Sequence, residues 1–189
     1  MANQDSPFGL RAIGKIGQNR DNQGLAEFSI AASATAIYGQ DPVKAAATET
    51  IEVAGAGDTL LGSLNGVFFT AADTSKPTFA NHLNASNTAT DIVGFVSSDP
   101  YERFEIQSDN TTASAQTDVF MNYDITYSTG STHDFISGVE LDDSTTSATS
   151  GQLKVVGVSK DIKNNDLGAS HVNFVVMINE HFLNSTAGV

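Results

Sequence analysis

The chain has 189 residues, enough for one domain with an ordinary core, since a globule of this size buries roughly 70% of its extended-chain surface. It contains no cysteine, which excludes disulfides, thiolate zinc sites and a cysteine nucleophile. Nine basic and 22 acidic residues give a net charge of −13, a field that repels nucleic acid and anionic membranes, so we expect neither as a partner.

The composition predicts a mainly β fold. Ser and Thr together supply 38 residues, whereas charged residues make up only 16% of the chain. Thr suits pleated strands and Ser suits turns, while long amphipathic helices need more Glu, Lys, Arg and Leu. No apolar run approaches the roughly 18 residues of a membrane span, and the first residues lack the pattern of a signal peptide. We therefore expect a soluble all-β protein that is not exported.

Residues 1–24 form a distinct opening segment. The first 20 residues carry three bases and one acid, a net +2, so the remainder carries −15. Apolar residues alternate here with glycines at a density that opposes a helix. Two interpretations stay open: an extended N-terminal arm outside a single β domain of residues 25–189, or an ordinary first strand and loop of that domain.

Short strand-like runs separated by turn signals follow in the first half of the β domain. We expect strands near residues 27–31, 35–38, 66–70 and 92–96. Residues 50–53 and 59–61 flank Gly55-Ala-Gly-Asp58 and predict a hairpin with a glycine-assisted turn. Residues 43–47 are the only alanine-rich candidate for a helical turn.

The second half continues the same rhythm. Residues 101–107 alternate cleanly between apolar and polar positions, residues 171–180 carry an apolar residue at every second position, and 118–127, 135–141 and 153–158 are further strand candidates. The stretch 142–152 is almost entirely Asp, Ser, Thr, Ala and Gly, which indicates an exposed, mobile loop. Strands recurring every 8–14 residues favour an antiparallel β-sandwich or barrel with little helix.

Motifs that carry chemistry are missing from the sequence. The four histidines are scattered without metal-ligand spacing, so no metal and no cofactor are expected. The acid pairs on polar loops lack EF-hand spacing, and no glycine motif matches a nucleotide loop or a nucleophile elbow. We therefore predict no catalytic residues and a protein that is not an enzyme.

Several segments resemble a group of small structural proteins of tailed phages, in which marine phages are especially rich. They are MANQDSPFGLR at 1–11, GQDPV at 39–43, GSLNGVFF at 62–69 with KPTF at 76–79, FVSSDPYERFEIQ at 95–107 and VGVSKD at 156–161. The resemblance spans nearly the whole chain. It implies a virion component without enzymatic activity, a capsid decoration (cement) protein on the outer capsid surface.

The resemblance implies the major capsid protein as a partner, and a homo-oligomer, a trimer or else a dimer. The basic and apolar opening segment is then the natural surface for contact with the shell or with a neighbouring subunit. We predict that this interface consists of Phe8, Leu10, Arg11, Ile13, Lys15, Ile16 and Arg20. Burial of its apolar side chains alone would not order the segment, so strand pairing with a partner is expected to contribute.

Two alternatives from other classes remain open. A receptor- or glycan-binding module of a head fibre is suggested by the polar loop 142–152 and by the aromatic candidates Tyr101, Tyr123 and Tyr127. A tail or neck component of the same virion would share this composition and fold style.

Overall fold

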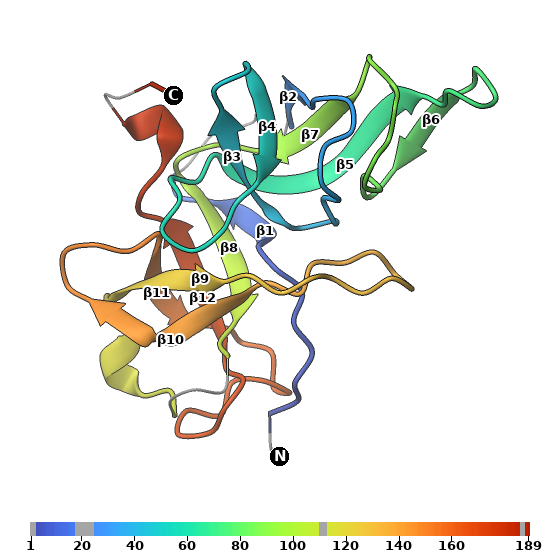
Figure 1. Cartoon of the computed structure of the whole chain (residues 1–189). Helices are drawn as coiled ribbons and strands as arrows, with labels where there is room; N and C mark the ends of the chain where they lie inside the picture. Colours follow the sequence, from blue (N-terminus) through green and yellow to red (C-terminus); the bar gives the residue numbers. More distant parts are fainter. Residues whose placement is uncertain (1–2, 18–24, 110–112, 186–187) are drawn as a thin grey trace.

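The chain folds almost entirely into β-strands arranged as two antiparallel sheets that pack as a sandwich (Figure 1). The computed structural model describes residues 3–17, 25–109, 113–185 and 188–189. Neither sheet closes into a barrel, which settles the choice between sandwich and barrel. Within these residues no helix is long and apolar enough to cross a membrane. The predicted all-β fold class is confirmed.

Sheet A contains the first strand and all of the strands from the second half of the chain. Its order is β1 (Arg11–Lys15), β8 (Glu102–Gln107), β12 (Asn173–Ile178), β11 (Leu153–Val158), β9 (Asn122–Thr126) and β10 (Glu140–Ser147). Two short 3₁₀ turns, Gln116–Asp118 and Phe182–Asn184, lie before β9 and after β12.

Sheet B is built from one continuous stretch of the chain between β1 and β8. Its order is β2 (Ala26–Ser29), β7 (Val93–Ser97), β5 (Gly62–Thr70), β3 (Pro42–Ala46) and β4 (Thr50–Val53), and β6 (Pro77–Ala80) pairs with the far end of β5. The sheet curls so far that a single bridge between Ile30 and Ile51 joins the β2 and β4 sides.

The central strands of sheet A follow the alternation that the sequence predicted. Phe104 and Ile106 on β8 lie opposite Val176 and Phe174 on β12, and all four side chains are buried. Glu105 and Gln107, which alternate with Phe104 and Ile106 along β8, are also buried. The reason is that β1 and the residues before it pack against them. Such cross-strand apolar pairs are the unit of sheet stabilisation.

Each sheet has its own hydrophobic cluster, and residues from loops connect the two. The cluster of sheet A includes Leu10, Ala54 and Leu60, of which the last two come from the loop that joins β4 to β5 in sheet B. In the other direction, Phe182 near the C-terminus packs on the cluster of sheet B. The backbone of Leu60 also bridges to His181. The sandwich is therefore held by these crossings as well as by its two cores.

The prediction of a helical turn at residues 43–47 is wrong, and so is the predicted hairpin between residues 50–53 and 59–61. The hairpin partner of β4 is β3, with Val43 opposite Val53 and Ala46 opposite Thr50. The helix propensity of three alanines is small beside the backbone bonds that β3 makes with β4 and β5 and the complete burial of Val43.

The prediction that residues 142–152 form an exposed loop holds only for residues 148–150 and is wrong for the rest of the stretch. Strand β10 extends to Ser147 and pairs with β9, with an irregularity between Asp142 and Ser147. Gln152 is completely buried, and its amide nitrogen donates to the carbonyl oxygens of Gly55 (2.9 Å) and Asp58 (2.7 Å). Strands pair through backbone groups, so a run of polar residues can form a strand when its polar side chains are hydrogen-bonded. Such a strand cannot be recognised from a pattern of apolar residues.

Leu10 joins the opening segment to the core. Its side chain is fully buried, its N–H donates to the carbonyl of Gln40 (2.9 Å), and its own carbonyl accepts from the Ser63 hydroxyl (2.6 Å). The described residues before it, 3 to 9, run along the body without regular secondary structure (Figure 1). The segment is thus packed on its own chain at Leu10 and continues into β1.

We predict that Leu10→Ala lowers the free energy of unfolding by roughly 2–5 kcal/mol, the usual cost of emptying a well-packed core position. The matched control Ile13→Ala, three residues away on an exposed position, should cost less than about 1 kcal/mol. Urea denaturation followed by circular dichroism measures both values. Equal, small losses would show that the opening segment is not part of the cooperative fold.

Candidate contact surface

Strand β1 is the end strand of sheet A, and no other described strand pairs with its outer side. It pairs with β8 in antiparallel register, with Ala12 opposite Phe104 and Gly14 opposite Arg103. Between these two pairs β1 advances by two residues while β8 advances by only one. Ile13 is therefore the extra residue of a β-bulge. A bulge turns its side chain away from the regular alternation, which accounts for the exposure of Ile13.

The seven residues predicted to form the interface differ in their surroundings. The Leu10 side chain is fully buried, so it anchors the segment in the core and cannot contact a partner. Phe8 is partly buried, and the Arg11 guanidinium lies 4.3 Å from its ring centre. Arg11 also forms an ion pair with Glu105 on β8. These contacts hold Phe8 and Arg11 on the body of the same chain.

Ile13 and Ile16 are the members of the set that expose apolar surface, each with 45% of its area accessible. Lys15 is mostly covered and its ammonium group lies 3.0 Å from Asp99. Arg20 lies outside the described residues. The positive charges of Arg11 and Lys15 therefore already have acidic partners within the chain, and the apolar isoleucines are what this surface can offer to another protein.

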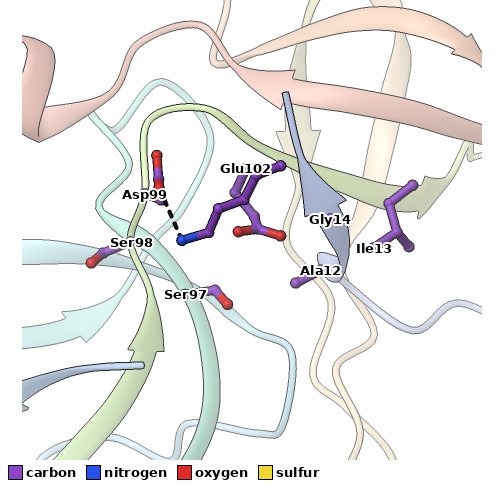
Figure 2. A pocket seen from close by; sticks show the side chains of 8 residues that line it. Ala12, Ile13, Gly14, Ser97, Ser98, Asp99 and Glu102 are labelled. Carbon is purple, nitrogen blue, oxygen red and sulfur yellow. Dashed lines mark ion pairs between the residues drawn. The ribbon is translucent and has the colours of Figure 1, made fainter. Parts of the chain in front are cut away.

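A polar cavity of about 230 Å³ lies between β1 and the turn that joins β7 to β8 (Figure 2). It is lined by residues 12–15, 97–99 and 102. Figure 2 shows the Asp99 carboxylate at one wall and Glu102 nearby, with the ion pair to Asp99 as a dashed line. Burial raises the pKa of Glu102, and the nearby positive charge of Lys15 partly opposes that shift.

A second candidate surface lies on sheet B, around Phe79 of strand β6. Phe79 is 73% exposed, and its ring packs against Phe68 (4.8 Å between centroids) and Phe95 (6.4 Å). A groove of about 370 Å³ runs beside these rings and is also lined by Asn65 and Asn81. Sequence reasoning missed this surface because Phe68 and Phe69 in a run of apolar residues indicated a buried strand. The available signal was the proline two residues before Phe79, because a proline in a strand is typical of a sheet edge.

The aromatic residues that the sequence suggested for glycan binding have different environments. Tyr101 and Tyr127 are exposed, whereas Tyr123 is 2% exposed and belongs to the core of sheet A. The suggestion is therefore wrong for Tyr123, because the alternation of β9 turns its side chain inward.

Asp41 is a fully buried carboxylate beside the point where Leu10 enters the core. One of its oxygens accepts the N–H of Tyr38 (2.8 Å). Burial raises the pKa of Asp41 from 3.8 to about 6, against the opposing effect of hydrogen bonds from Ser137 and Tyr38. The stability of the region around Asp41 therefore depends on pH.

Comparisons with protein-family models, with curated proteins and with solved structures find no match for this chain. Its function must therefore be inferred from its own residues.

We predict that the protein becomes less stable as pH rises from about 4 to about 7. An acid with a raised pKa in the folded state binds a proton that the unfolded chain has already released, so its contribution is complete below pH 3.8 and lost above pH 6. For Asp41 the loss amounts to about 3 kcal/mol. Melting temperatures between pH 4 and 8 measure the trend.

Asp41→Asn should flatten this pH dependence, because the asparagine does not titrate. Repulsion within a chain of net charge −13 acts in the same direction, so Asp73→Asn, which removes an exposed acid, is the control. Parallel pH curves for the wild type and Asp41→Asn would contradict the assignment to Asp41.

Proposed function

We propose that the protein is a non-enzymatic structural component of a virion, a capsid decoration protein that binds the outer surface of a phage head and stabilises contacts between capsid subunits. The observation that carries this proposal is the position of β1: an end strand whose outer side is paired with none of the described strands and which carries exposed Ile13, next to exposed Ile16. The resemblance of the sequence to structural proteins of tailed phages supplies the class of partner, the major capsid protein.

An unpaired strand edge is a ready site for another strand. Its outward N–H and C=O groups can continue the sheet into a partner, and natural proteins usually protect such edges with charge or coverage. In β1, Arg11 and Lys15 are bound to acids of the same chain, which leaves Ile13 as the side chain that protrudes from the strand. The contact we propose is therefore strand addition supported by two isoleucines.

The acidic remainder of the chain suits the outward face of a decorated particle. The residues after position 20 carry a net −15, and like charges on neighbouring particles repel each other. A weak contact per copy is sufficient, since repetition over a symmetric shell, or association as a trimer or dimer, multiplies it.

A glycan-binding module of a head fibre is the second candidate, favoured by the groove at Phe79. An exposed ring flanked by the amides of Asn65 and Asn81 combines an apolar platform with hydrogen-bonding groups, as small polar ligands require. The two candidates use different sheets and can be separated by variants.

We predict that Ile13→Ser combined with Ile16→Ser weakens binding to heads stripped of the protein by at least about tenfold, since it removes the exposed apolar part of the contact. Phe79→Ser is the control, since it removes a more exposed apolar side chain from the other sheet, and it should bind as the wild type does. Sedimentation of heads with labelled protein measures occupancy.

Loss of head binding with Phe79→Ser alone would place the capsid contact on sheet B and contradict the proposed contact at β1. The glycan-binding function is tested separately by a glycan array, on which Phe79→Ser should lose the signal of the wild type. Full occupancy by the double isoleucine variant would contradict the proposed contact. The copy number in purified particles separates a decoration protein, with hundreds of copies, from a tail or neck component with about a dozen.

A further inference from the structure

Three side chains with metal-binding groups meet at the end of the molecule where the opening segment begins. They are Asp5 of that segment, Glu140 at the start of β10, and His171 in the turn before β12. One ligand atom from each lies within 4.8 Å of the other two. The three residues are more than 30 positions apart in the sequence, so the fold alone assembles the group.

Buried amide side chains hold Asp5 in place. The carbonyl oxygen of Gln4 accepts hydrogen bonds from Asn164 (2.8 Å) and Gln107 (3.0 Å), and the N–H of Ser6 donates to Gln107 (2.8 Å). Asn164 also donates to the carbonyl of His171 (2.7 Å). The same two amides therefore anchor both neighbours of Asp5 and the backbone of His171.

Two ligand atoms in the group are buried without any hydrogen bond. They are Oε1 of Glu140 and Nδ1 of His171, and the latter has an Asp5 oxygen at 3.8 Å. Buried polar atoms are almost always hydrogen-bonded, so two such atoms in one group call for a partner of another kind. This observation distinguishes the group from carboxylates that merely share an exposed surface.

The electrostatic environment favours a cation. Besides Asp5, the carboxylates of Asp109 and Asp143 lie near Glu140, so several negative charges gather in a partly buried place. A bound positive ion relieves the repulsion among them.

We propose that Asp5, Glu140 and His171 bind a divalent transition-metal ion, with Zn²⁺ as the preferred ion. An imidazole nitrogen with two carboxylates is a ligand set for zinc or a neighbouring first-row metal, whereas Ca²⁺ and Mg²⁺ take oxygen ligands only. Three protein ligands and one water complete the four-coordinate shell that zinc adopts.

The spacing of the ligand atoms is compatible with such an ion. With ligand distances of roughly 2.0–2.2 Å, atoms around a tetrahedral zinc lie roughly 3.3–3.6 Å apart. From separations of up to 4.8 Å the group must therefore contract by up to about 1.5 Å, and the exposed side chain of Asp5 can supply that movement. The ion would tie residue 5 to β10 and to the turn before β12, which stabilises the opening segment on its own chain.

The test is a titration of the purified full chain with ZnCl₂, read by melting temperature and by calorimetry. We expect one equivalent of Zn²⁺ to raise the melting temperature and to slow hydrogen exchange at residues 3–8, while Ca²⁺ and Mg²⁺ at the same concentration have little effect. No saturable zinc response would overturn the proposal.

Two variants locate the site. Glu140→Gln removes a ligand while relieving the crowding of carboxylates, so it should fold well and weaken zinc binding by at least about tenfold. His171→Asn should do the same, because asparagine tolerates the left-handed backbone of residue 171 (φ +59°) but lacks the imidazole.

His133→Ala is the control, since His133 is an exposed histidine that does not belong to the group. It should respond to zinc as the wild type does. Unchanged zinc affinity in both Glu140→Gln and His171→Asn, or its loss in His133→Ala, would place zinc on another histidine and overturn the proposal. None of these measurements involves a capsid, so they stand or fall separately from the proposed function.

Discussion

The structure depends on the close packing of the chain at Gly9 and Leu10. Gly9 adopts a left-handed backbone (φ +71°), and a Cβ atom there would overlap the carbonyl oxygen of Gln40 and the side chain of Ser137. Only glycine therefore lets the backbone approach closely enough for Leu10 to enter the core. Strand β1 and the residues before Gly9 take their positions on either side of this point.

The contact surface on β1 and the proposed metal site both depend on this packing at Gly9 and Leu10. On one side, β1 becomes the end strand of sheet A, with Ile13 displaced outward by a bulge. On the other side, Asp5 comes to lie beside Glu140 and His171. Of the bases in the opening segment, Arg11 and Lys15 pair with Glu105 and Asp99, so within the described residues exposed apolar side chains distinguish this surface more than positive charge does.

The fold class and the central strands could be predicted because they depend on local alternation. β8 and β12 carry apolar residues at every second position, and both were expected within a few residues of their observed ends. The strand structure of residues 43–46 and of the polar strand β10 could not, since their own side chains lack apolar alternation and their strand structure comes from pairing with β4, β5 and β9. The same holds for the group at Asp5, because no spacing within the sequence signals three ligands that only tertiary packing brings together.

The pairing of β1 with β8 also makes sheet B an insertion between two neighbouring strands of sheet A. All of sheet B lies between these two strands in the sequence, and the N–H of Ile16 donates to the carbonyl of Tyr101 (3.0 Å) where the chain leaves sheet A and returns to it. Sheet B thus begins and ends at adjoining points, as an inserted module does. A short turn between residues 16 and 101 would close β1 and β8 into a simple hairpin, which makes this junction the natural place to graft a different module onto sheet A.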